Sequence, residues 1–124
     1  MTRFYMDDDM NIIKAPATKD DLCGWANEYD LAYFDGLMAK QEPGVDIAIV
    51  DDVGGTAGFG PENRILYFEK AIVGSEKFCR IAMLHELIHI KLFATTGDAD
   101  ENHGLAFKTE RKRLWDAGAY EDLL

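Results

Sequence analysis

Apolar residues recur at roughly helical spacing over residues 20–40, which predicts a first helix there. Thr18 is a suitable N-cap, whereas residues 1–18 show no clear periodicity and Pro16 argues against an earlier helix. Gly36 falls inside the pattern and indicates a break or a turn. The apolar positions are Leu22, Trp25, Ala26, Tyr29, Leu31, Ala32, Tyr33, Phe34, Leu37 and Met38.

Three short stretches then carry the pattern of β-strands. Residues 45–50 are β-branched and alternating, residues 56–60 predict a second strand weakened by glycine, and residues 64–69 predict a third. Turn-forming residues at 51–55 and 61–63 separate them. Because these connections are short, we expect the three strands to form a small antiparallel meander.

The C-terminal half carries two further helical patterns. Ser75 is a suitable N-cap for a long helix, and Gly97 is placed to end it. A polar loop at 98–102 leads to a last helix over residues 103–116, which Gly118 would stop. The apolar positions are Phe78, Ile81, Ala82, Leu84, Leu87, Ile88 and Leu92 in the first helix, and Leu105, Ala106, Phe107, Leu114 and Trp115 in the second.

One helix, three short strands and two helices, in this order, predict an α+β fold. The 124 residues fit one domain and leave little room for a second. We therefore expect a single domain over residues 1–124, with a core of about 20–117.

Charge and composition limit the kinds of binding partner and the cellular compartment that we expect for this chain. The net charge of −10 repels phosphate backbones, which argues against nucleic acid as a partner without excluding it. The longest apolar stretch, residues 81–93, is interrupted by charged residues and histidines, so it cannot span a membrane. The chain start turns acidic at residues 7–9, where an export signal would be apolar. We therefore expect a cytoplasmic protein in which Cys23 and Cys79 are reduced, mostly buried thiols.

The long helix contains an arrangement typical of zinc enzymes. His85 and His89 are four residues apart, so their imidazoles project from one face of the helix. Two ring nitrogens placed in this way can both reach one zinc ion about 2.0–2.1 Å away. Glu86 is rotated by about 100° around the helix axis and would lie beside the ion, within reach of its water. The H-E-x-x-H spacing therefore predicts a hydrolytic zinc centre with Glu86 as general base.

A catalytic zinc site usually takes a third protein ligand and keeps one position for water. His103 is the only other histidine of the chain, and residues 90–102 allow one helix to end and the chain to return to the site. Glu101 and Glu110 are rivals, because some H-E-x-x-H enzymes use a glutamate. We favour His103, so that all three histidines would bind a single zinc ion.

The segment His85–His89, followed by an acidic loop and His103–Phe107, resembles the SprT-like metallopeptidase domain, whose signature is H-E-x-x-H followed by H-G-x-x-F. The resemblance extends upstream to the aromatic segment Tyr33–Leu37 and to Gly58 ahead of the last strand. It covers roughly residues 20–115. Its implication for the architecture is a zincin-like fold.

By this resemblance, His85, His89 and His103 would bind zinc, and Glu86 would be the general base. Many members carry a cysteine-rich zinc ribbon after the peptidase domain, and this sequence lacks one, so it resembles a minimal form. Known DNA-dependent members use basic or aromatic surfaces on DNA, and the acidic charge of this chain does not support that role.

We therefore expect a zinc-dependent metallopeptidase that hydrolyses peptide bonds in a protein or peptide substrate. The alternatives are a zinc-bearing interaction or structural domain with weak or lost activity, and a metal-dependent hydrolase of a non-peptide substrate. The presence of Glu86 argues against the first, since a structural site needs no general base. Only the family resemblance argues against the second.

An extended substrate peptide could pair with a sheet edge, for which we expect the strand at 64–69. Tyr67 and Tyr120 are candidates for stabilising the oxyanion, with nothing to choose between them. The acidic loop that contains Asp98, Asp100 and Glu101 either orients a ligand histidine or is simply solvated, and we favour the solvated loop.

Overall fold

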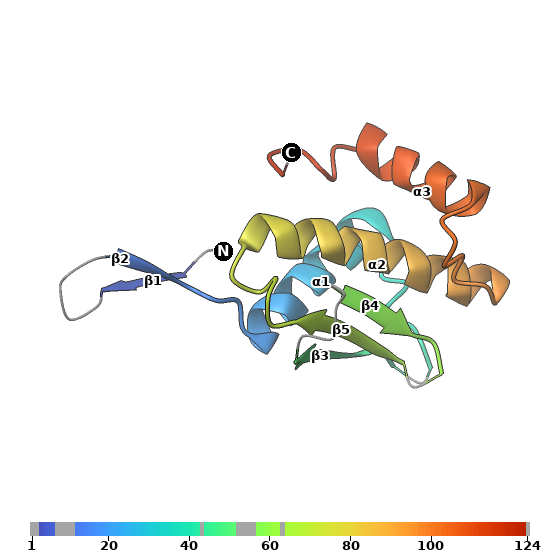
Figure 1. Cartoon of the computed structure of the whole chain (residues 1–124). Helices are drawn as coiled ribbons and strands as arrows, with labels where there is room; N and C mark the ends of the chain where they lie inside the picture. The colour runs from blue at the N-terminus through green and yellow to red at the C-terminus, as the bar shows by residue number, and fades with distance from the viewer. Residues whose placement is uncertain (1–2, 7–11, 43, 52–56, 63, 124) are drawn as a thin grey trace.

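The computed structural model describes residues 3–6, 12–42, 44–51, 57–62 and 64–123. In chain order its elements are β1 (Arg3–Met6), β2 (Ile12–Ala15), α1 (Lys19–Tyr33), β3 (Asp46–Val50), β4 (Ala57–Gly60), β5 (Ile65–Glu69), α2 (Glu76–Thr96) and α3 (Leu105–Asp116). The predicted α+β fold class is confirmed, with α2 lying between the three-stranded sheet and α3 (Figure 1). Most of the predicted turn at 51–55, together with Thr56 and the acidic residues 7–9, lies outside the described residues.

The first helix begins where the sequence predicts and ends earlier. The hydroxyl of Thr18 accepts the N–H of Asp21 at 3.2 Å, and the Asp21 carboxylate accepts the N–H of Thr18 at 2.9 Å. This reciprocal capping box fixes the helix start. The helix ends at Tyr33, and Asp35 and Gly36, with φ of 55° and 72°, are both left-handed in the turn that follows, a conformation that glycine adopts without steric cost. Buried Asp30 accepts two backbone N–H groups of that turn, at 2.9 and 3.1 Å.

Strand β5 is the central strand of the three-stranded sheet and not an edge strand. The strand order is β3-β5-β4, with β3 parallel and β4 antiparallel to β5. The predicted antiparallel meander is therefore wrong: the sheet is mixed, and β3 and β4 are not neighbours. The connection at 51–56 is long enough for this order, because crossing two strand spacings requires only about 10 Å.

The two faces of the sheet differ in burial. Leu66 and Phe68 of β5 have no exposed surface and face the helices, with Phe59 of β4 opposite Leu66. Tyr67 points to the other face, because side chains alternate along a strand. Its ring covers Gly58, where a Cβ atom would lie 2.3 Å from the Tyr67 hydroxyl oxygen. Any larger residue at position 58 would therefore force the Tyr67 ring to move.

The long helix α2 packs against α1, α3 and β4 (Figure 1). The Ser75 hydroxyl accepts the N–H of Phe78 at 3.2 Å, and Gly97 ends the helix in the left-handed conformation, with φ of 79°. Both caps are as predicted. The side chains of Leu84 and Ile88 are fully buried, so the helix that carries the H-E-x-x-H motif is anchored in the core.

Strands β1 and β2 form an antiparallel hairpin that the sequence analysis did not predict. Arg3 pairs with Ala15 and Met6 with Ile12, and Figure 1 shows the hairpin projecting from the rest of the chain. Residues 1–18 show no clear periodicity, so the sequence pattern gave no indication of these two strands.

Two predictions about cysteines and membranes can be compared with the structure. Cys23 is half-buried and Cys79 is buried, which agrees with the predicted burial, and neither forms a disulfide bond among the described residues. No helix among the described residues is long and apolar enough to cross a membrane.

Candidate metal centre

Three imidazoles from two parts of the chain converge at one point. His85 and His89 project from α2 with their Nε2 atoms 3.3 Å apart. His103, in the turn before α3, places its Nε2 3.1 Å from that of His85 and 3.2 Å from that of His89. These residues form the only group of three or more potential metal ligands among the described residues. The structure therefore brings together the three histidines singled out in the sequence.

The triangle of nitrogens has the size that a tetrahedral zinc ion requires. With Zn–N bonds of about 2.0–2.1 Å, two ligand nitrogens lie about 3.3–3.4 Å apart, which is close to the observed 3.1–3.3 Å. Three histidines with a fourth position open are a donor set typical of catalytic zinc. The residues present thus fit a bound metal ion.

His89 is oriented by a carbonyl group behind it. Its Nδ1 lies 2.6 Å from the backbone oxygen of Ala99, and only 1% of His89 is exposed. Since a carbonyl can only accept, Nδ1 carries the proton and donates it. The lone pair of the neutral ring is then on Nε2, which points into the triangle, as in metal sites whose histidine is held by an outer hydrogen bond.

Phe107 packs against all three imidazoles. Its ring centroid lies 4.8 Å from those of His85 and His89 and 4.5 Å from that of His103. Phe107 is fully buried in the first turns of α3. It therefore restrains the rings that form the triangle and excludes water from one side of them.

His103 lies outside α3, contrary to the predicted helix start at His103. Gly104 is the N-cap and supplies no side-chain hydrogen bond. Asp100 supplies the missing partner, because its carboxylate accepts the N–H groups of Gly104 and Phe107, both at 3.0 Å. The expectation of a merely solvated loop is therefore wrong for Asp100. The sequence did not reveal this role, because the known start signals are a cap immediately before the helix and acidic residues in its first turn, whereas Asp100 lies four residues before the N-cap.

Glu86 is a buried carboxylate beside the histidines. It is 5% exposed, and its Oε2 has no hydrogen-bond partner among the described residues. Burial raises the pKa of Glu86 to about 7, and the nearby carboxylate of Glu101 adds to this effect. A buried oxygen without a hydrogen bond calls for a polar partner that the described residues do not provide, such as a water molecule in the site.

Burial lowers the pKa of His85 to about 4, and the neighbouring His89, His103 and Arg111 contribute in the same direction. His85 is therefore neutral at pH 7, which is the form that binds metal ions.

The two glutamates considered as rival ligands lie outside the histidine cluster. Both carboxylate oxygens of Glu110 accept the ammonium group of Lys91, at 2.8 and 2.9 Å. Although burial opposes ionisation, hydrogen bonds from Arg113 and Lys91 lower the pKa of Glu110. Glu110 is thus an ion-pair partner between α2 and α3, and Glu101 is exposed.

A hollow of about 210 Å³ opens directly beside His85 and Glu86. Its remaining lining residues are Ala57, Phe78, Ile81 and Ala82. Ala57 belongs to β4, which pairs only with β5 among the described strands and is therefore a sheet edge. The expectation that residues 64–69 form the edge is wrong, since β5 is paired on both sides.

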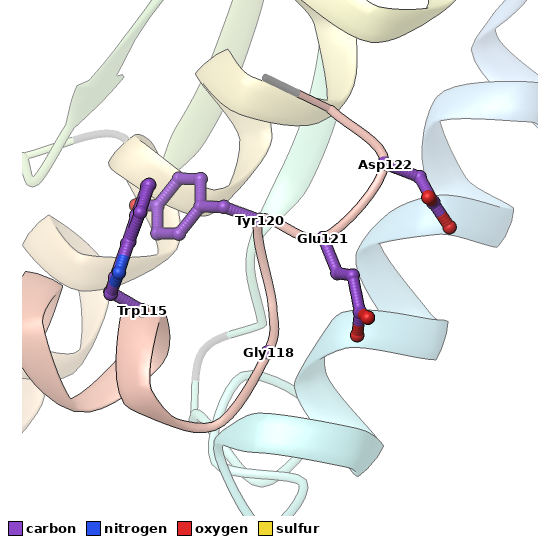
Figure 2. Close-up of a pocket in the computed structure, with 5 residues that line it drawn as sticks. All are labelled: Trp115, Gly118, Tyr120, Glu121 and Asp122. Carbon is purple, nitrogen blue, oxygen red and sulfur yellow. The ribbon is translucent and has the colours of Figure 1, made fainter.

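Neither tyrosine considered for the oxyanion lines the hollow beside His85 and Glu86. Tyr67 lies on the face of the sheet opposite the helices. Tyr120 stacks on Trp115 with ring centroids 5.9 Å apart, and Figure 2 shows Glu121 and Asp122 on the opposite side of this segment, toward α1. The hollow at this place, of about 320 Å³, is lined by Trp115, Gly118, Tyr120, Glu121 and Asp122. It includes none of the histidines.

Comparison with known proteins agrees with this picture. A solved structure, the metallopeptidase zymogen jannalysin of Methanocaldococcus jannaschii, has a similar fold, with a TM-score of 0.59 and 23% sequence identity. The similarity covers 83% of this chain and 89% of that one. No curated protein matches the sequence. The profile of the SprT-like family matches residues 24–121, and the chain belongs to the SprT-like family.

Proposed function

We propose that this chain is a zinc-dependent metallopeptidase that hydrolyses peptide bonds in a protein substrate. His85, His89 and His103 hold one zinc ion, and Glu86 is the general base. One observation carries the proposal: three Nε2 atoms 3.1–3.3 Å apart lie beside a buried carboxylate whose Oε2 has no partner among the described residues.

Zinc, when bound, polarises the scissile carbonyl and lowers the pKa of the attacking water. Glu86 takes a proton from this water as the water oxygen bonds to the carbonyl carbon. Glu86 then delivers the proton to the amide nitrogen as the C–N bond breaks, which regenerates the carboxylate. Burial of Glu86 supports both steps, because it raises the proton affinity of the carboxylate.

The hollow and the edge of β4 are where the substrate binds in this proposal. An extended peptide adds to an exposed sheet edge through main-chain hydrogen bonds. Strand β4 is such an edge, and its Ala57 lines the same hollow as His85 and Glu86. A side chain of the peptide would enter the hollow, whose Phe78 and Ile81 favour an apolar group.

Family and fold support peptide bonds as the target over other hydrolysable bonds. The chain belongs to the SprT-like family, and the similar solved structure is named a metallopeptidase zymogen. A purely structural zinc site usually has four protein ligands, whereas here three imidazoles converge next to Glu86. The net charge of −10 argues against nucleic acid as a partner, and two cysteines without a disulfide bond among the described residues favour the cytoplasm.

Removal of the metal tests the proposal directly. Protein stripped with a chelator is expected to lose peptidase activity on casein and to regain it on addition of one equivalent of zinc. Zinc should also stabilise the fold, by about 4 kcal/mol when free zinc is a thousandfold above the Kd, so the thermal unfolding temperature should rise. Native mass spectrometry should find one zinc per chain. Hydrolysis by metal-free protein would contradict the proposal.

The substrate position is tested by hydrogen exchange. A bound, uncleavable peptide analogue is expected to slow exchange of amides in β4, because the outward N–H groups of that edge become hydrogen-bonded. Strand β3 is the internal control, since it forms the other edge of the sheet. Protection of β3 but not of β4 would show that the peptide binds elsewhere.

A further inference from the structure

Asp100 holds the backbone on both sides of His103. The N–H of His103 donates to the backbone carbonyl of Asp100 at 2.9 Å. The N–H of Gly104, the next residue, donates to Asp100 Oδ1 at 3.0 Å. The two peptide units that flank the His103 Cα atom are therefore both tied to one residue.

The second carboxylate oxygen extends this link to α3. Asp100 Oδ2 accepts the N–H of Phe107 at 3.0 Å, and Phe107 is the residue whose ring contacts all three imidazoles. These two backbone hydrogen bonds lower the pKa of Asp100, so the carboxylate is charged at neutral pH. A negative charge at this position also favours the helix N-terminus.

The turn from Asp100 to Gly104 needs these bonds, because its backbone is unusual. Asp100 and His103 both have φ of 55°, in the left-handed region that residues other than glycine rarely adopt. Gly104 leaves room for the carboxylate, since a Cβ atom there would lie 3.2 Å from Asp100 Oδ1. The position of the His103 ring thus depends on contacts beyond its own side chain.

We propose that Asp100 is a positioning residue for the third metal ligand, which sets the metal affinity of the site by fixing the backbone at His103. Asp100 belongs to no metal-binding group of the described residues, so it acts through His103 and not on the ion. The inference rests on the proposed function, in that it takes His103 as a ligand. Groups that orient metal ligands typically change affinity by about 10–100-fold when removed.

The test is zinc affinity, measured by competition with a chromophoric chelator on the full chain. Asp100→Ala is expected to weaken zinc binding by about 10–100-fold. Asp100→Asn should weaken it less, because the amide keeps one acceptor oxygen. Asp20→Asn, the same change at an exposed position in α1, should leave the affinity unchanged. Zinc affinity of Asp100→Ala within about threefold of the wild type would overturn the inference.

A double-mutant comparison separates positioning from general loosening of the fold. In the His103→Ala background, whose weaker residual zinc binding is measured with a low-affinity chelator, Asp100→Ala should have little further effect on zinc affinity, because the ligand it positions is already gone. An equal loss in both backgrounds would overturn the inference. If Asp100→Ala does not fold, the same comparison with Asp100→Asn decides it.

The two single variants distinguish failure of the proposed ligand set from failure of the role given to Asp100. If His103→Ala binds zinc as tightly as the wild type, the proposed ligand set fails. If His103→Ala loses zinc but Asp100→Ala keeps it, only the role of Asp100 fails. The absorption spectrum of the Co²⁺-substituted protein gives a second reading, since a displaced His103 changes the tetrahedral ligand field.

Discussion

Glu86→Gln is expected to reduce peptide hydrolysis by about 10²–10⁴-fold while zinc remains bound. Glutamine has nearly the same shape as glutamate but cannot take up the proton of the attacking water. The three imidazoles are untouched by the change, so metal content should stay at one zinc per chain. The fold should also persist, because a neutral side chain is easier to bury than the Glu86 carboxylate, which is 5% exposed.

The measurement is kcat/KM on a fluorogenic peptide, with zinc content determined for the same sample. Glu28→Gln is a matched control, since Glu28 is an exposed glutamate of α1 and should retain full activity. Undiminished hydrolysis by zinc-loaded Glu86→Gln would remove Glu86 as the general base.

His103→Ala is expected to lose zinc and, with it, activity. Removing a residue that only hydrogen-bonds to a metal ligand typically weakens metal binding by about 10–100-fold. Removing the ligand itself should weaken zinc binding by more. Only His85 and His89 would remain, on a single helix. His103 lies in the turn before α3 and outside the hydrophobic core, so circular dichroism should show an intact fold although Phe107 loses one of its ring contacts.

Glu101→Gln serves as the matched control for His103→Ala. Glu101 lies in the same loop and is one of the two rival ligands considered from the sequence, but it is not part of the histidine cluster. It should therefore keep wild-type zinc affinity. Full zinc occupancy in His103→Ala would show that His103 is not the third ligand. Loss of zinc in Glu101→Gln would point to Glu101 instead.

The local part of the fold could be predicted from the sequence because local rules determine it. The caps at Thr18, Ser75 and Gly97 depend on residues within one turn of the helix end. Likewise, the projection of His85 and His89 from one face follows from helix geometry alone. Such features need no knowledge of tertiary structure.

The order of the strands could not be predicted in this way. Periodicity identifies a strand and its buried face, but the choice of neighbours depends on how the sheet packs on α1 and α2. The short connections predict that consecutive strands pair, which would place β5 at the edge. The true edge near the histidines is β4, and the substrate site could be located only once that was known.

The conformation of the turn before α3 also could not be predicted from the sequence pattern. Counting histidines and the family resemblance were enough to select His103, but not to show how it is held. Its left-handed backbone and its bonds to Asp100 are tertiary features that link a loop to a helix start. Hydrophobic periodicity cannot detect such features, because no apolar position is involved.

The chain contains three histidines, and all three lie in the same cluster. In protein without an affinity tag, every imidazole resonance in an NMR spectrum therefore comes from the proposed metal centre. Nitrogen-15 labelling of histidine alone would report which ring nitrogen carries a proton and which binds a metal. Metal exchange and inhibitor binding could then be followed without assigning any other residue.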